Sequence, residues 1–340
     1  MSNYERPGVY TSYEASGGLR GGSGGGAVGL AAAASSGKAG EVKLLTSYAE
    51  AVSAFGGGNM VALVKLLLEN GAPEVYACAV AGSDYDTAFS ALMGAAAVRY
   101  MVCDSRSAAV HAKLSAAIAG ADEQSKYRIG IVESGETARD KLVSAAAALN
   151  SERMVLVSHH ETDGVPGAVA AAVCGAVAGE SDPAVPLGGA ALSGLGEIGG
   201  NFSDSDLELL LRGGVTALET VGGAVSVVRG VTTRTKTAGA ADDTWHDLGT
   251  ILIVDEVIPG IRDALRAGFA RAKNTAQTRG AIRTRVVIEL ESYQQREIID
   301  GYSDVRAEAD ESDGSICAVS FCFGVAHGLS RVELKANITI

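Results

Sequence analysis

The sequence of 340 residues predicts an α/β fold, with a central domain built on a largely parallel sheet and a smaller α+β domain near the C-terminus. Three observations predict it. Short apolar runs alternate with helix-periodic segments, a polar segment at 231–244 separates two regions of different character, and the last ten residues alternate strictly between apolar and polar. The expected divisions are an N-terminal arm (1–20), a central domain (21–235), a C-terminal domain (236–330) and a C-terminal arm strand (331–340).

The N-terminal arm opens with Arg6-Pro7-Gly8-Val9-Tyr10, which we expect to be extended, because proline fixes φ and disfavours helix in the residue before it. A glycine-rich run follows from Gly17 to Gly29. Glycine-rich chain has little tendency to order, so this run predicts a flexible joint.

The central domain alternates between strands and helices from Ala27 onward, and a helix is expected from Asn59, as its cap, to Asn70. Apolar residues fall on one face of this helix, and Gly71 is expected to end it in the left-handed conformation. Later residues 215–218 and 224–229 are expected to pair as a hairpin. Further helices are expected at 85–93, 105–119, 137–149, 166–178 and 206–212, and strands at 75–80, 98–103, 128–132 and 154–158. Short links between alternating strands and helices favour a parallel sheet.

The C-terminal domain begins with an apolar stretch, 251–257, which leads through Pro259 into a helix carrying Arg262, Arg266 and Lys273 on one side. A second helix is expected at 282–299, followed by strands. Residues 262–285 hold seven basic residues and one acid in a chain of net charge −12. This basic stripe indicates either a solvated helix face or docking on an acidic protein surface, with nucleic acid as a third reading.

The last ten residues give the sharpest local pattern. Polar residues separate the apolar Val332, Leu334, Ala336, Ile338 and Ile340. This period of two predicts a strand with one buried face that runs to the chain end. Such a strand needs a sheet to join, either that of its own subunit or that of a neighbour.

Composition excludes several classes of protein. Hydrophobic residues make up 47% of the chain and aromatic residues only 5%, a bias toward small side chains that suits close packing of elements and wide subunit contacts. The net negative charge argues against nucleic-acid binding, and the most membrane-like run, 165–179, is too short to span a bilayer. No signal peptide is evident. The five cysteines form no CxxC pair and are interpreted as buried, reduced thiols of an intracellular protein.

Candidate catalytic and cofactor motifs are weak. Gly24-x-Gly26-x-x-Gly29 fits a dinucleotide fingerprint, but the residues before it do not resemble a strand. Ser36-Gly37-Lys38 lacks the earlier glycine of a P-loop. His159-His160-Glu161 follows a predicted strand but has too few further metal ligands nearby, and Cys317 and Cys322 are expected on opposite faces of one strand, packed in the core. We therefore expect no catalytic residues, no cofactor and no metal.

Several blocks of the chain, taken in order, resemble the phage tail sheath family. They are the RPGVY opening at residues 6–10, the block from Ala27 to Gly56, and the later passages GVPGAVAAAVCG, NFSDSDLELLLRGGV, AVSVVRGVTTRT and RVELKANITI. Each block is weak alone, and their order and spacing carry the resemblance over nearly the whole chain. The chain is short for the family and corresponds to its core without the extra protruding domains.

The resemblance implies a structural subunit of a contractile tail sheath in a phage or tailocin-type particle, assembled in the host bacterial cytoplasm. Subunits would stack as six-fold rings around an inner tube, with baseplate and tail terminator proteins as further partners and with no membrane or nucleic-acid partner. The arms would add strands to neighbouring C-terminal domains through Val9, Tyr10, Val332, Leu334, Ile338 and Ile340. Arg262, Arg266 and Lys273 would face the tube.

Two alternatives stay open at this point. One is a nucleotide- or metal-dependent α/β enzyme with residues 21–230 as its catalytic domain. The other is a tube or baseplate component of the same kind of particle, although a tube protein is expected to be smaller and richer in strands.

Overall fold

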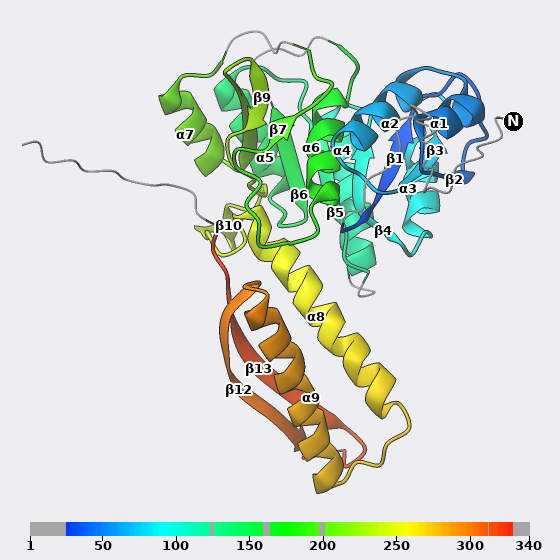
Figure 1. Cartoon of the computed structure of the whole chain (residues 1–340). Helices are drawn as coiled ribbons and strands as arrows, with labels where there is room; N and C mark the ends of the chain where they lie inside the picture. The colour runs from blue at the N-terminus through cyan, green and yellow to red at the C-terminus, as the bar shows by residue number, and fades with distance from the viewer. Residues whose placement is uncertain (1–24, 123–125, 159–163, 197–200, 312, 329–340) are drawn as a thin grey trace, which may run out of the picture.

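The computed structural model describes residues 25–122, 126–158, 164–196, 201–311 and 313–328. Its larger body is an α/β domain, and a long helix leads from it into a smaller body of helices and two strands (Figure 1). This arrangement confirms the predicted α/β class with a smaller α+β part at the C-terminal end. The two predicted arms, 1–20 and 331–340, lie wholly outside the described residues.

A nine-stranded sheet forms the centre of the larger domain within the described residues. Its strands follow the order β2-β3-β1-β4-β5-β6-β8-β9-β7. The six strands from β3 to β8 in that order are parallel, while β2 and β9 run antiparallel to their neighbours. The predicted hairpin at 215–229 is confirmed by the pairing of β8 with β9. The strands are β1 (Ala27–Ala32), β2 (Val42–Leu45), β3 (Val75–Ala79), β4 (Val98–Cys103), β5 (Ile129–Glu133), β6 (Met154–Ser158), β7 (Ala191–Leu192), β8 (Val215–Val221) and β9 (Ala224–Val227).

Helices cover both faces of this sheet, so its parallel strands are apolar on both sides. One face is covered by α1 (Tyr48–Phe55), α2 (Asn59–Glu69) and α6 (Ala168–Gly179). The other face is covered by α3 (Tyr85–Met93), α4 (Ala108–Asp122), α5 (Arg139–Leu149) and α7 (Asp204–Arg212). In β1 the buried side chains alternate between the two cores: Leu30 faces the first and Ala31 the second.

Small residues allow α2 and α6 to approach closely. A Cβ on Gly175 would lie 2.7 Å from the Leu67 carbonyl oxygen, and a Cβ on Gly179 would lie 3.0 Å from the backbone of Gly71. The apolar run at 165–179 is therefore mainly a helix buried between the sheet and α2. Among the described residues, no helix has the length and apolar character needed to cross a membrane.

Two expectations for the start of the central domain are wrong. The glycine run does not stay a flexible joint as far as Gly29, because Gly29 lies inside β1, where a Cβ would come within 2.6 Å of the Met101 sulfur. Helix α2 is not capped by Asn59: Gly58 occupies the cap position, and the Asn59 amide donates instead to Asp104 Oδ2 at 3.0 Å. Gly71, with φ of +104°, does leave the helix with the positive φ expected of it.

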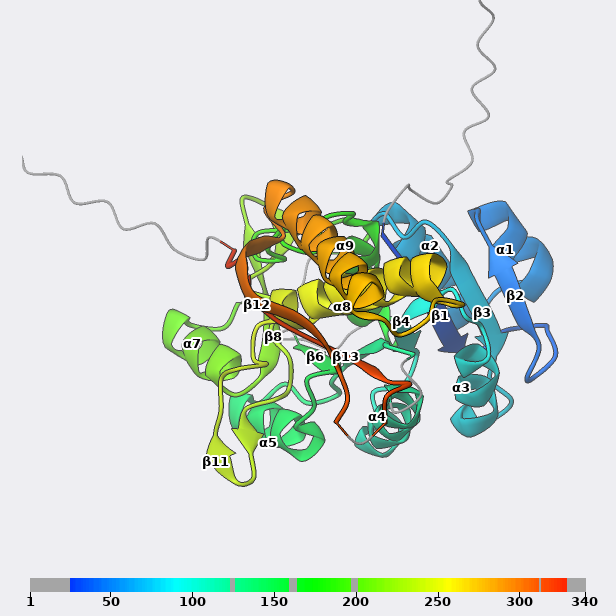
Figure 2. The ribbon, with the colours of Figure 1, turned by 90° about the horizontal axis from the view of Figure 1, so that it is seen from below.

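The smaller body contains α8 (Leu248–Phe269), α9 (Ala276–Gln295) and a hairpin of β12 (Ile299–Ala309) and β13 (Cys317–Val325). A third apolar core joins them. This body extends away from the lower edge of the large sheet (Figure 1), so in the view from below it stands in front of the middle strands (Figure 2). A small hairpin of β10 (Lys236–Thr237) and β11 (Ala240–Ala241) stands in the polar segment before it.

The predicted helix boundaries in this body are wrong at three points. The apolar stretch 251–257 is part of α8, and Pro259 lies inside the helix rather than before it. Lys273 lies beyond the end of α8, in the connection to α9. Helix α9 begins at Ala276, because the Thr275 hydroxyl caps it by accepting a hydrogen bond from Thr278 N. The helix ends at Gln295, and Ile299 is the first residue of β12.

Candidate assembly surfaces

The carboxyl ends of the parallel strands are where α/β enzymes bind ligands, and here internal contacts fill that edge. Asp104 follows β4, and its carboxylate accepts hydrogen bonds from Ala33 N, Asn59 Nδ2 and Tyr85 Oη. The distances are 2.8, 3.0 and 2.7 Å. This side chain joins the chain after β1 to the starts of α2 and α3, so its role is structural.

Glu133, at the end of β5, is used in the same way. It is fully buried, accepts from Arg106 Nε at 2.6 Å and accepts from Val169 N at 2.9 Å in the first turn of α6. Burial raises the pKa of the Glu133 carboxyl, and the contact with Arg106 opposes that rise. The N-terminus of α6, a place where an anion could otherwise bind, is thus occupied by the chain's own carboxylate.

The motifs singled out in the sequence do not form a site in the described residues. Gly26 lies directly before β1 and Gly29 lies inside it, so neither stands at the start of a helix. These glycines therefore cannot form a dinucleotide-binding turn. Among the described residues no group of three or more His, Cys, Asp or Glu is arranged to hold a metal ion. His159-His160-Glu161 lies outside them.

Three of the five cysteines, Cys78, Cys103 and Cys174, are buried as predicted. The prediction of core packing is wrong for Cys322, which is exposed, and only partly right for Cys317. Both lie on β13, where alternate residues face opposite sides and only one side of the hairpin is covered.

The basic stripe separates into engaged and free side chains. Arg262 donates to Tyr127 Oη at 2.8 Å, Arg283 donates to the Val305 carbonyl, and Arg285 pairs with Glu289. In contrast, Arg266 and Lys273 are exposed and make no hydrogen bond or ion pair through their side chains with another described residue. Free positive charge therefore gathers toward the end of α8 and in the connection after it, the part of the smaller body farthest from the sheet (Figure 1).

The hairpin β12–β13 has one covered and one open face. Phe321 and Phe323 point to the side on which α9 packs, together with Val305 of β12. The opposite face carries small and polar side chains such as Ser303, Ser320 and Cys322. Along most of each outer edge no further strand pairs within the described part of the chain, so backbone N–H and C=O groups stand ready for another strand.

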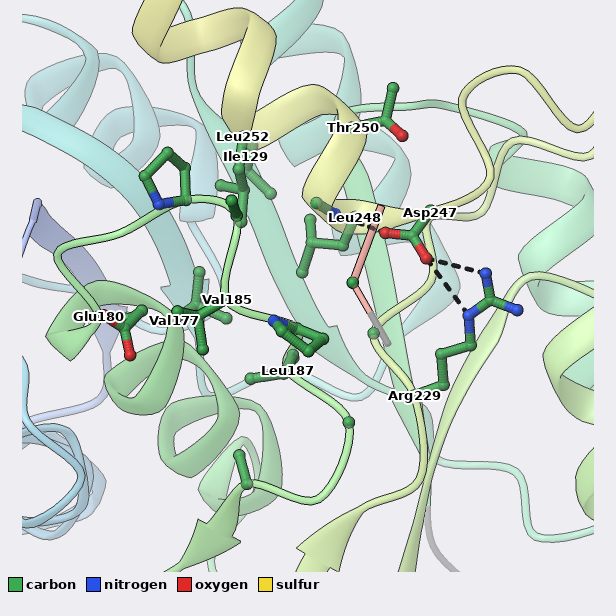
Figure 3. Close-up of a pocket in the computed structure, with 18 of the residues that line it drawn as sticks. Ile129, Val177, Glu180, Val185, Leu187, Arg229, Asp247, Leu248, Thr250 and Leu252 are labelled. Carbon is green, nitrogen blue, oxygen red and sulfur yellow. Dashed lines mark hydrogen bonds and ion pairs between the residues drawn. The ribbon is translucent and has the colours of Figure 1, made fainter. Parts of the chain in front are cut away.

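A groove of about 1530 Å³ lies between the larger domain and the smaller body. Part of its wall is apolar and is formed by Val177, Leu187 and Leu248 (Figure 3). At one side of the groove, Arg229 Nη2 lies 2.9 Å from Asp247 Oδ2. Gly25 and Gly328, where the described chain begins and ends, both line this groove. The described part of the chain therefore begins and ends at this groove.

The arm positions predicted to join subunits, Val9, Tyr10, Val332, Leu334, Ile338 and Ile340, lie outside the described residues. The strand predicted to carry Cys317 and Cys322 is β13. What sequence reasoning missed is that the alternation of Val319, Phe321 and Phe323 along it leaves one face of the hairpin uncovered.

Comparison with known proteins places these surfaces in context. Residues 240–339 match the family model described as the phage tail sheath C-terminal domain. A search of curated protein sequences gave no match.

Solved structures match along almost the whole chain. The helical sheath of the anti-feeding prophage in its contracted state is similar with a TM-score of 0.75 and 17% identity, covering 98% of this chain and 99% of that one. A chain of the six-fold symmetrised baseplate of the same particle gives 0.76 and 17%, covering 99% and 100%. The sheath tail protein from Desulfitobacterium hafniense gives 0.69 and 12%, covering 94% and 100%. The C-terminal domain of this chain therefore belongs to the phage tail sheath family, and the chain as a whole has the fold of a tail sheath protein.

Proposed function

We propose that this chain is the structural subunit of a contractile tail sheath, which polymerises around an inner tube and contracts to drive the tube through a target cell envelope. The observation that carries the proposal is the two-stranded sheet of the smaller body, whose edges are open in a chain with the sheath fold. A two-stranded sheet is marginal alone, and strands from other subunits would complete it.

The arms are the proposed source of those strands. The N-terminal arm would contribute through Val9 and Tyr10, and the C-terminal arm through Val332, Leu334, Ile338 and Ile340. Both ends of the described chain, Gly25 and Gly328, line the groove, which supports arms that leave the subunit from its surface and can reach neighbouring subunits. The six-fold symmetry of the matched baseplate assembly supports six subunits per ring.

The inner tube is the proposed partner of the free basic side chains. Arg266 and Lys273 carry this part of the proposal, while Arg262 is also held by Tyr127 of its own chain. Exposed charges interact weakly and are screened by salt, which suits a contact that must be released on contraction. Baseplate and terminator proteins would cap the two ends of the polymer, within a phage or tailocin-type particle assembled in the bacterial cytoplasm.

The proposal assigns no catalytic residue, cofactor or metal to the chain. Its support is the way Asp104 and Glu133 fill the ligand-binding edge of the sheet with internal hydrogen bonds. The subunit would instead do its work through the free energy difference between two assembled states.

Electron microscopy of the purified chain at high concentration tests the proposal. We expect tubes or stacked rings with a hollow bore. Leu334→Asp with Ile338→Asp should abolish them, because charge on the buried face of the arm strand cannot enter a sheet. The matched control, Lys335→Asp with Asn337→Asp, alters the other face of the same strand and should still assemble.

If the chain alone forms no tubes or rings, it should next be mixed with the inner tube protein. If neither the chain alone nor the mixture forms a sheath, the proposal is wrong. Arg266→Glu with Lys273→Glu should then be compared with Lys141→Glu with Lys236→Glu, which makes the same charge change in α5 and β10, outside the smaller body. Only the first pair should reduce sheathing of tubes while leaving the subunit folded.

A further inference from the structure

Helix α8 belongs to both bodies of the molecule. Leu248 and Ile251 lie in the first core of the larger domain, whereas Val257 and Ile261 lie in the core of the smaller body. No linker separates the two, so a single helix of 22 residues carries the connection. A helix anchored at one end only could still pivot, and its further contacts with the larger domain decide whether it does.

The central contact is a buried ion pair. Arg153, just before β6, donates from Nη1 to Asp255 Oδ2 at 2.7 Å and from Nη2 to Asp255 Oδ1 at 2.9 Å. Arg153 is 7% exposed and Asp255 6% exposed. Arg153 Nε also lies 2.9 Å from Asp122 Oδ1 at the end of α4. A paired, two-bond contact of this kind fixes the direction of both side chains as well as their distance.

A second contact lies two helical turns farther along α8. Arg262 donates to Tyr127 Oη at 2.8 Å, and its guanidinium carbon lies 5.5 Å from the centre of the Tyr127 ring. The same ring has the Arg153 guanidinium at 5.0 Å. Tyr127 thus links the two contacts. Leu248 and Arg262 are 14 positions apart, so the helix is held along about 21 Å of its length.

A third contact uses the proline inside α8. Pro259 has no N–H, so the carbonyl of Asp255, four residues earlier, loses its helical partner. Arg99 of β4 fills that position, donating from Nη2 to the Asp255 carbonyl oxygen at 3.0 Å. Its Nη1 lies 3.4 Å from Glu256 Oε2. The point where proline weakens the helix is therefore held by a side chain of the other body.

We propose that Arg99, Tyr127, Arg153, Asp255 and Arg262 form an interdomain clamp that sets the angle between the larger domain and the smaller body. The clamp selects an orientation more than it adds stability, because a buried ion pair is commonly no more stabilising than apolar residues of the same size. Its use in assembly rests on the proposed sheath function. A subunit whose angle is already fixed loses less conformational entropy when it joins a repeating polymer.

Distances between two spin labels on the full-length chain test the clamp. One label goes on the exposed native Cys322 of β13 and the other on Ala147→Cys of α5, in a Cys317→Ser background. The unaltered clamp should give one narrow distance distribution. In Arg153→Met/Asp255→Leu, where apolar residues replace the pair, the distribution should shift or broaden by about 5 Å. A hinge change of about 10° produces a displacement of that order over a helix of about 33 Å.

The matched control is Arg106→Met/Glu133→Gln, which removes a partly buried ion pair that lies wholly within the larger domain. It should leave the distance distribution unchanged even if it lowers thermal stability. If the clamp variant does not fold, Arg153→Lys keeps the charge but cannot make the two-bond contact, and a smaller shift is expected. An unchanged distribution in a folded clamp variant overturns the proposal.

The assembly assay separates this proposal from the proposed function. If the unaltered chain forms sheaths, the clamp variant should lose most of them. If the unaltered chain forms none, the sheath function fails, yet the distance measurement on single subunits still decides whether the clamp sets the angle.

Discussion

The nine-stranded sheet and the two-stranded sheet of β12 and β13 differ in how far the chain itself completes them. Strands of the nine-stranded sheet are covered on both faces by helices and contribute to two continuous apolar cores. The two-stranded sheet of β12 and β13 is covered on one face, and its outer edges are open in the described residues. The first sheet accounts for most of the buried apolar core, whereas the second leaves open edges to which a further strand could be added. Mutations and chemical probes should therefore affect the two sheets differently.

The largest expected effect is in the larger sheet. Leu30→Ala removes a fully buried side chain from β1 and should cost about 2–5 kcal/mol of unfolding free energy. Val319→Ala in β13 removes a partly exposed side chain and should cost about 1 kcal/mol or less in the free subunit. Denaturant unfolding of the two variants measures this difference. Equal losses would contradict the view that only the larger sheet is complete in the free subunit.

A smaller effect is expected where helices of the larger domain touch. Gly175→Ala places a Cβ 2.7 Å from the Leu67 carbonyl oxygen, and backbone cannot easily move away, so a loss of about 1–3 kcal/mol is expected. Gly120→Ala in α4 provides the control, since a Cβ there meets nothing within 4 Å. That control should gain about 0.5–1 kcal/mol from helix propensity. Thermal melts of both variants against the parent chain would reveal the opposite signs.

A pH-dependent effect is expected at His111, which is buried in α4 with Nε2 2.7 Å from the Ser105 carbonyl oxygen. Burial lowers the pKa of His111 in the folded chain. Its contribution to stability is thus present above the unfolded pKa of about 6.5 and is lost as pH falls through the lower folded value. Unfolding midpoints between pH 7.5 and about 5 should show the parent chain losing its advantage over His111→Gln. A constant difference between the two would exclude this assignment.

The smallest perturbation is chemical labelling at the open face of the hairpin. Cys322 is exposed, while Cys78, Cys103 and Cys174 are buried, and burial raises the pKa of each buried thiol. A thiol reagent should therefore modify Cys322 in the native subunit first, Cys317 more slowly and the other three only after unfolding. Mass spectrometry of the labelled chain follows the order. Rapid modification of Cys78 would show that the larger sheet is less closed than described.

Local patterns were sufficient to predict much of the larger domain. The bounds of β4, β6 and α3 agree with the predicted ranges, because apolar runs of strand length and capped helices specify them locally. The exposed edges and groove could not be predicted, since they depend on which elements the fold leaves uncovered. Pro259 misled the prediction of α8, because the sequence does not show that Arg99 supplies the missing hydrogen bond.

One signal of the clamp was nevertheless present in the sequence. Asp255 stands inside the apolar run ILIVDEVI, and a carboxylate at such a position must find a partner when buried. That partner is Arg153, which lies 102 positions away in the sequence, so only the fold shows that the two residues meet.

The shared helix α8 also determines where this protein can be divided. A fragment beginning at residue 240, where the family match starts, would contain α8 but none of the sheet against which Leu248 and Ile251 pack. In such a fragment the apolar start of α8 would lack the sheet that covers it, and the Asp255 carboxylate would lack Arg153. A fragment ending before α8 would leave the complementary part of the first core uncovered. The two bodies are distinct in shape but share α8, so a gene fusion or domain exchange at this joint should keep the whole of α8 together with the sheet.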